Sequence, residues 1–228
     1  MNIIVISLER AKERKEQITS QLRDLNIEAI IYNCFDVADI KNPTFGAKFT
    51  LIGGYRYGDI MKGGEIGCTI SHITALNMAK ALKWEYVIIL EDDVILAKDF
   101  EKRINLLLKM LPKDWEHVYL SGIPRFTSYF LKTNLIQLMP SIPEKLHRVD
   151  GTCSFIVRNI AYDKVIKKLT SLETTPDDLI NHFIFKERLL KSFVYLPFVT
   201  YVNDEFTYIN GEKNNRIHPS KEFYVEKI

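Results

Sequence analysis

The sequence predicts an α/β fold in which helices flank a central, mostly parallel sheet. Apolar runs rich in β-branched residues alternate with segments whose apolar residues recur at helical spacing. The first run, residues 3–8, is apolar almost throughout, as expected for a strand buried on both faces. Hydrophobic residues make up 46% of the chain and include 13 Phe and 11 Tyr, which is ample material for a large core.

The elements alternate in order along the chain. A stripe of alanine, isoleucine and leucine predicts a helix over 11–25, and a second strand follows over 29–34. Residues 36–64 are crowded with glycine and proline, which predicts a long functional loop. Further strands are expected at 86–90, 117–120, 153–158 and 193–202, and further helices at 64–82, 98–110, 162–169 and 177–190. No glycine-rich phosphate loop follows the first strand, so a Rossmann or P-loop fingerprint is absent from the sequence.

Length and charge narrow the classes of protein. We expect one domain spanning residues 1–228, because the sequence contains neither a linker nor a repeat. The net charge of +2 argues against a dedicated nucleic-acid binder. Three cysteines at wide spacing do not form a disulfide framework or a CxxC metal motif. The opening segment lacks the features of a signal peptide, and no window is apolar enough to span a membrane, so we expect a cytoplasmic protein.

The sharpest motif is an acidic run at the end of an apolar strand. Val87–Leu90 are followed directly by Glu91, Asp92 and Asp93. In open α/β sheets ligands bind at the carboxyl ends of strands, and hard oxygen ligands suit Mn²⁺ or Mg²⁺. Along a strand Glu91 and Asp93 share one face, whereas Asp92 points away. The simpler alternative is an acidic loop that only solvates a strand end. We favour a metal site, since three adjacent charges at the tip of a buried strand repel one another.

A second motif opens the predicted helix over 64–82. Glu65, Cys68 and His72 are spaced i, i+3 and i+7, so they lie on one helical face. The glycines before them would allow the helix N-terminus to approach a phosphate closely. The alternative is that Glu65 merely favours the helix dipole and that His72 is a hydrogen-bonded, partly buried histidine.

Together the two motifs resemble glycosyltransferase family 25, which includes lipooligosaccharide biosynthesis enzymes and is similar to collagen galactosyltransferases. The resemblance rests on Gly-Glu-Ile-Gly-Cys-x-x-Ser-His at 64–72 and Ile-Leu-Glu-Asp-Asp-Val at 89–94. It extends to the opening Ser7-Leu8 with Arg10 and Arg14, and to Pro-x-Asp at 176–178. The resemblance implies a GT-A-like fold that binds a nucleotide sugar, and a C-terminal tail, about 203–228, that folds over the donor.

The resemblance also implies roles for particular residues. Asp93 would bind the divalent ion directly, with Glu91 near it or near the ribose. His218 in the tail is the candidate for a further metal ligand. The remaining residues of the matched motifs are expected to bind the donor: Ser7, Leu8, Arg10, Arg14, Glu65, Ser71, His72, Glu91 and Asp92.

An inverting transferase needs a general base for the acceptor hydroxyl. The matching Pro-x-Asp makes Asp178 the first candidate, with Asp177 beside it and Asp150 in reserve. The residues Thr-Pro-Asp-Asp at 175–178 also read as a helix start in which both acids satisfy the N-terminus. The sequence leaves the catalytic and the capping interpretation open.

The predicted function is an inverting, metal-dependent glycosyltransferase that moves a hexose from a UDP-sugar to a lipooligosaccharide core. Galactose from UDP-galactose is the first choice of donor. Its expected partners are the donor and the glycolipid acceptor, without nucleic acid and with peripheral contact at the cytoplasmic face of the inner membrane. The alternative is a metal-dependent nucleotidyl or phosphoryl transferase that uses the same carboxylates. A non-enzymatic carbohydrate-binding or scaffold protein is the third class.

Overall fold

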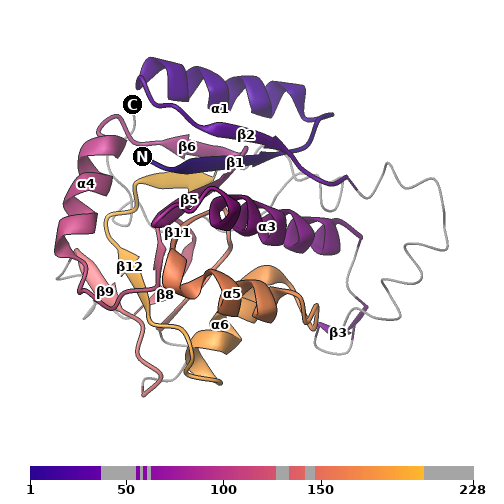
Figure 1. The fold of residues 1–228 in the computed structure, drawn as a ribbon, viewed down its shortest axis with the longest axis vertical. Helices are drawn as coiled ribbons and strands as arrows, with labels where there is room; N and C mark the ends of the chain where they lie inside the picture. Colours follow the sequence, from indigo (N-terminus) through magenta and orange to yellow (C-terminus); the bar gives the residue numbers. More distant parts are fainter. Residues whose placement is uncertain (37–54, 57–58, 61–62, 127–133, 142–146, 203–228) are drawn as a thin grey trace.

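The computed structural model describes residues 1–36, 55–56, 59–60, 63–126, 134–141 and 147–202. Its centre is a seven-stranded sheet in the order β2-β1-β5-β11-β7-β12-β9 (Figure 1). These strands are β1 (Ile3–Ser7), β2 (Ile30–Asn33), β5 (Tyr86–Glu91), β7 (His117–Tyr119), β9 (Leu135–Gln137), β11 (Ser154–Arg158) and β12 (Ser192–Tyr195). Strands β2, β1, β5, β7 and β12 run in one direction, whereas β11 and β9 run in the other. The predicted α/β class with a mostly parallel sheet is therefore confirmed.

Helices cover both faces of this sheet (Figure 1). They are α1 (Lys12–Asp24), α3 (Gly63–Ala81), α4 (Phe100–Met110), α5 (Tyr162–Leu169) and α6 (Pro176–Phe185). A short 3-10 helix, η4 (Asn159–Ala161), leads into α5. The remaining strands of the described residues form short pairs: β3 (Tyr55–Arg56) with β4 (Asp59–Ile60), β6 (Val94–Leu96) with β13 (Thr200–Val202), and β8 (Ile123–Phe126) with β10 (His147–Asp150). None of the helices in the described ranges is long and apolar enough to cross a bilayer.

Side-chain alternation along the strands divides the core into two layers. On β1, Ile4 and Ile6 pack with α3, α5 and α6, whereas Ile3 and Val5 pack with α1 and α4. The same alternation holds on β5, where every residue from Val87 to Leu90 is buried. This two-sided burial explains why these strands read as continuous apolar runs. The first charged residue after this buried run, Glu91, therefore lies at the end of β5 and at the edge of the sheet.

Two expected boundaries differ from the structure. The helix expected over 177–190 ends at Phe185, because Arg188 adopts a left-handed φ of 58° that a continuing helix does not allow. The strand expected over 193–202 is two strands, β12 in the central sheet and β13 paired with β6. Pro197 lies between them and has no N–H for a sheet hydrogen bond. Most of the glycine-rich loop at 36–64 lies outside the described residues, as does the tail over 203–228.

Buried His117 on β7 makes the stability of the fold sensitive to acid. Its ring contacts Tyr119 edge-on and Phe155 at 5.4 Å between centroids, and its Nδ1 lies 2.7 Å from Ser192 Oγ. Burial lowers the pKa of His117 to about 3. An unfolded histidine has a pKa of about 6.5, so between these values only the unfolded chain binds the proton. The stabilising contribution is thus complete above pH 6.5 and is lost as the pH falls.

Protonation of His117 in the unfolded chain is expected to lower the free energy of unfolding by about 2 kcal/mol between pH 7 and pH 5. Urea unfolding of the wild type and His117→Asn at the two pH values measures the effect. The variant is expected to have a lower free energy of unfolding than the wild type at pH 7. Its free energy of unfolding should fall by about 2 kcal/mol less than that of the wild type between pH 7 and pH 5. An equal loss in both proteins would assign the acid sensitivity to other groups.

Candidate functional site

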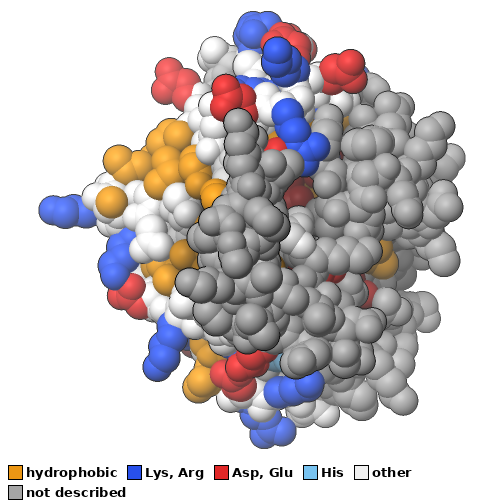
Figure 2. All heavy atoms as spheres, turned by 90° about the vertical axis from the view of Figure 1, so that its right-hand side faces the viewer, with side chains coloured by type: hydrophobic (Ala, Val, Ile, Leu, Met, Phe, Trp, Pro, Cys, Tyr) orange, Lys and Arg blue, Asp and Glu red, His pale blue; other side chains and the backbone are white. Residues whose placement is uncertain are grey.

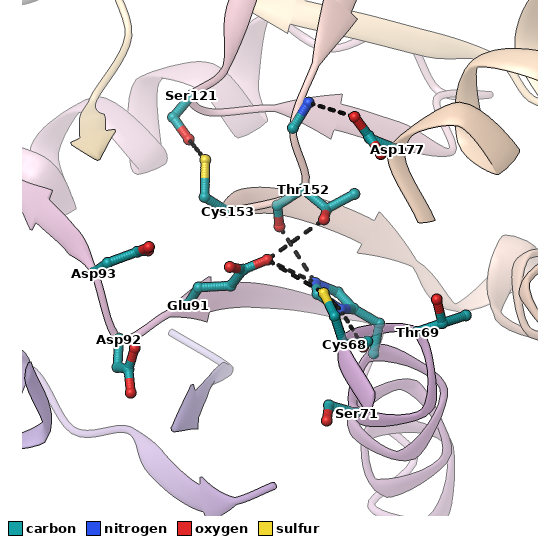
Figure 3. A network of polar contacts seen from close by, with 12 residues as sticks. Cys68, Thr69, Ser71, Glu91, Asp92, Asp93, Ser121, Thr152, Cys153 and Asp177 are labelled. Carbon is teal, nitrogen blue, oxygen red and sulfur yellow. Dashed lines mark hydrogen bonds and ion pairs between the residues drawn. The ribbon is translucent and has the colours of Figure 1, made fainter. Parts of the chain in front are cut away.

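The acidic run lies at the carboxyl end of β5, where the chain turns into β6. Glu91 is the last residue of β5, and Asp92 and Asp93 form the turn before Val94. Figure 3 shows Glu91 and Asp93 on one side of the chain and Asp92 pointing away from them. The strand alternation inferred from the sequence therefore predicted the correct relative directions, although Asp92 and Asp93 themselves belong to a turn.

Helix α1 fixes this turn through two side chains. Arg14 Nη2 lies 2.7 Å from Asp92 Oδ1 and 2.7 Å from Asp93 Oδ2. Further along the helix, Gln21 donates to the Val94 carbonyl and accepts from the Leu96 N–H. Burial raises the pKa of Asp92, and the neighbouring Arg14 opposes that rise. Asp92 is thus buried and fixes the turn through its ion pair with Arg14, whereas the Asp93 side chain remains 18% exposed at the edge of the sheet.

The carboxyl end of β1 lies beside the same turn. Ile6 is in register with Glu91, so Ser7 and Leu8 follow at the level of the acidic run. Hydrogen bonds from Ser7 and the Leu8 backbone also act to lower the pKa of Asp92. Of the residues expected at the donor, the structure therefore brings Ser7, Leu8 and Arg14 to the acidic turn, whereas Arg10 pairs with Asp36.

The N-terminal half of α3 lies beside the Glu91 carboxylate. Cys68 Sγ lies 3.9 Å from Glu91 Oε1 (Figure 3). His72 Nε2 lies 3.6 Å from the same oxygen. The His72 ring stacks on Phe155 with 5.5 Å between centroids. Burial, followed by the charge of Glu91, raises the pKa of the Cys68 thiol, and burial lowers the pKa of His72. Cys68 and His72 both contact Glu91 Oε1, which confirms that these two residues share one face of the helix.

The other two expected residues of α3 form hydrogen bonds within the helix, Ser71 through its side chain and Glu65 through its backbone carbonyl. Ser71 is buried, and its hydroxyl donates to the Gly67 carbonyl at 2.6 Å. Glu65 lies in the first turn, where its carbonyl accepts a hydrogen bond from the Thr69 hydroxyl. These contacts agree with a structural role for Ser71, and Glu65 favours the positive end of the helix dipole.

The segment 151–153, which enters β11, completes the site, and the sequence motifs did not single it out. The Glu91 N–H donates to the Cys153 carbonyl at 2.8 Å, and the Thr152 hydroxyl donates to Glu91 Oε1 at 3.4 Å. Gly151 adopts a φ of +96°, and its N–H donates to Asp177 Oδ2 at 3.3 Å. The glycine before an apolar strand was the one sequence signal for a tight turn at this point.

The three candidate bases have different environments. Asp178 is buried, pairs with Arg148 Nη2 at 2.8 Å, and accepts hydrogen bonds from the hydroxyls of Thr174 and Thr175. Asp150 pairs with Nε of the same arginine. Asp177 is only half-buried, and its charge acts on Cys68 and His72 across the site. The predicted cap at Thr175 makes no side-chain bond to the backbone of α6, because its hydroxyl is directed to Asp178 instead.

The structure thus assembles one edge of the sheet from the ends of β1 and β5, the start of α3, the segment 151–153 and the start of α6. Carboxylates and Arg14 lie together there, which is an arrangement suited to a divalent ion and an anionic group. Figure 2 shows basic and acidic side chains intermixed around the described part of one face, rather than a patch of one sign. The proposed ligand His218 lies outside the described residues.

Comparisons with known proteins find relatives that match about half of this chain. Procollagen galactosyltransferase 2 of Mus musculus is 28% identical over 125 residues, which are 52% of this chain and 20% of that protein. Lipooligosaccharide biosynthesis protein lex-1 of Haemophilus influenzae is 28% identical over 121 residues, 45% of this chain and 40% of that protein. The chain thus matches less than half the length of these curated relatives, and other relatives carry names that describe them as inactive.

Among solved structures, a glycosyltransferase involved in the glycosylation of the major capsid of PBCV-1 aligns with a TM-score of 0.46. It is 11% identical, and the alignment covers 86% of this chain and 82% of the other. The sequence model described as glycosyltransferase family 25 (LPS biosynthesis protein) matches residues 1–180, which include both motifs and the start of α6. This chain therefore belongs to glycosyltransferase family 25.

Proposed function

We propose that this protein is an inverting, metal-dependent glycosyltransferase that moves a hexose from a UDP-sugar to a lipooligosaccharide core. The observation that carries the proposal is the acidic turn after β5. It lies beside the end of β1 and is held by Arg14, in a chain of family 25. The names of the relatives favour galactose as the sugar and a glycolipid as the acceptor. The proposed location is the cytoplasmic face of the inner membrane, where such a donor and acceptor meet.

Asp93 is the proposed ligand of Mn²⁺ or Mg²⁺. Its carboxylate is a hard oxygen donor, and it is partly exposed at the sheet edge. Glu91 is a weaker candidate for the same ion, because its carboxylate is turned toward Cys68, His72 and Thr152. When bound, the ion would neutralise charge that develops on the departing diphosphate. Arg14 adds a fixed positive charge beside the same position and orients both aspartates.

Asp177 is the proposed general base. It is half-buried, it lies in the first turn of α6 next to Gly151, and its charge reaches across the site to Cys68 and His72. Asp178, although first in the motif comparison, is committed to Arg148 and two threonine hydroxyls and is almost inaccessible. We therefore assign Asp178 a positioning role: it and Arg148 hold the start of α6 against β10. In this arrangement Asp177 would take the proton of the attacking acceptor hydroxyl.

A ligand screen with UDP, GDP and ADP tests the donor class. Each nucleotide is added with and without Mn²⁺, and the melting temperature is measured. A ligand at a hundred times its Kd stabilises the folded state by about 2.7 kcal/mol. We expect a Mn²⁺-dependent shift with UDP and none with GDP or ADP. The absence of any shift in a folded sample would overturn the proposal.

Product analysis separates the proposal from a nucleotidyl transferase that uses the same carboxylates. Glycosyl transfer from UDP-galactose to a lipooligosaccharide acceptor releases UDP, whereas nucleotidyl transfer from UTP to a sugar 1-phosphate releases pyrophosphate, so both pairs of substrates are supplied. We expect UDP as the product, formed only in the presence of the divalent ion. Pyrophosphate would instead favour the nucleotidyl reaction.

A further inference from the structure

A cluster of three metal-binding side-chain types joins α3 to β5. One donor atom each from Cys68, His72 and Glu91 lies within 4.8 Å of the other two, and within the described ranges these residues form the one such group. Thiolate, imidazole and carboxylate are the side-chain donors that bind zinc in proteins. Of the three, only Glu91 is also a weaker candidate for the ion of the proposed transfer reaction, whereas Cys68 and His72 have no role in binding that ion.

The hydrogen bonding of His72 points to a cation at this place. Nδ1 lies 2.9 Å from the Cys68 carbonyl, and Nε2 lies 3.3 Å from the Thr152 carbonyl and 3.6 Å from Glu91 Oε1. Carbonyl and carboxylate oxygens only accept hydrogen bonds, so both ring nitrogens face oxygen acceptors, and Cys68 Sγ also lies 3.6 Å from Nδ1. Either neutral tautomer therefore leaves one nitrogen lone pair directed at oxygen. The ring is 1% exposed, which disfavours the doubly protonated form that could satisfy both nitrogens.

A metal ion against Nε2 resolves this conflict. The Nδ1 proton can then be donated to the Cys68 carbonyl, which fixes the tautomer and directs the Nε2 lone pair toward Glu91. A backbone carbonyl that accepts from the second nitrogen is the usual support of a metal-binding histidine. The ion would also attract the carbonyl oxygen of Thr152 and the carboxylate of Glu91, which otherwise face each other across Nε2.

The separations of the donor atoms are close to those around zinc. Usual bond lengths in a tetrahedral zinc site place a sulfur and an oxygen, or a nitrogen and an oxygen, about 3.4–3.6 Å apart. Here Cys68 Sγ and Glu91 Oε1 are 3.9 Å apart, and His72 Nε2 and Glu91 Oε1 are 3.6 Å apart. The third pair, Cys68 Sγ and a ring nitrogen of His72, lies within 4.8 Å, so a small closure of the side chains would bring the three donors to one ion. A sulfur ligand favours zinc over manganese or magnesium, which prefer oxygen.

We propose that Cys68, His72 and Glu91 bind a Zn²⁺ ion that is separate from the ion proposed at Asp93. A Thr152 oxygen or a water molecule supplies the fourth ligand. On binding, the Cys68 thiol releases its proton to solvent and the thiolate sulfur donates its electron pair to the metal. The ion connects the start of α3, the end of β5 and the segment 151–153, and so fixes the side of the acidic turn opposite to Arg14.

Cobalt(II) is the probe, because a thiolate–cobalt bond produces a charge-transfer band and four-coordinate cobalt produces intense visible absorption. We titrate the reduced, metal-free full-length protein with Co²⁺ alone, without nucleotide. The wild type is expected to develop both features at one equivalent and to lose them when Zn²⁺ is added. Absence of the thiolate band in the folded wild type would overturn the proposal.

Three variants identify the ligands. Cys68→Ser is expected to abolish the thiolate band and to weaken zinc binding by at least about 100-fold. Cys34→Ser, the matched cysteine control outside the cluster, is expected to keep the band. Glu91→Gln is expected to keep the band but to weaken cobalt binding, and it tests the site independently if Cys68→Ser does not fold. A band that survives Cys68→Ser, or that disappears in Cys34→Ser, contradicts the assignment.

Asp93→Asn separates this proposal from the proposed transfer reaction. The variant is expected to retain the cobalt spectrum even though it loses the Mn²⁺-dependent response to UDP. Loss of the thiolate band in Asp93→Asn would mean that the protein has one shared metal site, which overturns the proposal of a separate one. A normal cobalt spectrum in a protein that does not respond to UDP would reject the donor class and leave the zinc site intact.

Discussion

Asp93→Asn is expected to lower glycosyl transfer by at least about 100-fold while leaving the fold intact. The substitution keeps the size of the side chain but removes the charge that would hold the divalent ion beside the diphosphate. The measurement is the initial rate of UDP release from UDP-galactose with Mn²⁺ and a lipooligosaccharide acceptor. We also expect the Mn²⁺-dependent thermal shift with UDP to disappear.

The matched control is Asp163→Asn, which makes the same exchange at a well-exposed position on α5. Asp163 pairs with Lys80 in the last turn of α3, at the other end of that helix from Cys68, and surface ion pairs of this kind contribute little. The control is expected to retain the wild-type rate and thermal response. Unchanged activity in Asp93→Asn would reject this carboxylate as the metal ligand. A wild type that neither releases nor binds UDP would instead favour a carbohydrate-binding or scaffold protein.

The neighbouring residues Asp177 and Asp178 are expected to give opposite phenotypes. Asp177→Asn should reduce kcat by about 100-fold or more with little change in unfolding free energy, because a general base contributes about 10²–10⁴. Asp178→Asn should instead destabilise the fold by about 3 kcal/mol, because it removes a buried partner of Arg148. Turnover rates and urea unfolding of the two variants measure the contrast.

The pH profile of kcat/KM distinguishes a lost base from a displaced substrate. In Asp177→Asn the acidic limb of the profile is expected to vanish, whereas in Asp178→Asn its shape should remain that of the wild type. The reverse pattern would assign catalysis to Asp178, as its place in the family motif implies. Equal loss of stability in both variants would indicate that both acids only anchor the start of α6.

The motif residues can be found from the sequence because they follow local rules. A strand that is buried on both faces is apolar throughout, as Val87–Leu90 are. The first charged residue after Leu90 is therefore expected at the edge of the sheet. Helical spacing alone is enough to predict that Cys68 and His72 share one face. Neither rule contains information about which distant segments meet that edge. Arg148 and Thr152 were missed for this reason, since no local pattern distinguishes them.

The same limit explains the two corrected boundaries and the change of candidate base. Apolar residues continue beyond both α6 and β12, so periodicity alone extends these elements too far. The φ of Arg188 and the missing N–H of Pro197 end them instead. At 175–178 the sequence allowed catalysis and helix capping equally. The difference between Asp177 and Asp178 arises only because Arg148 approaches from β10 and pairs with one of them.

By itself the sequence determined the α/β class, the position of the acidic run at a strand end, and the shared face of Cys68 and His72. Each of these properties depends on residues that are close in sequence, within about two turns of one helix or within one strand. Over such distances the backbone geometry fixes the direction of the side chains. The tertiary structure alone decided that Arg14 holds two aspartates, that Thr152 meets Glu91, and that Asp178 is buried. These contacts join residues 30 to 79 positions apart, and packing of the two core layers, rather than local preference, brings them together.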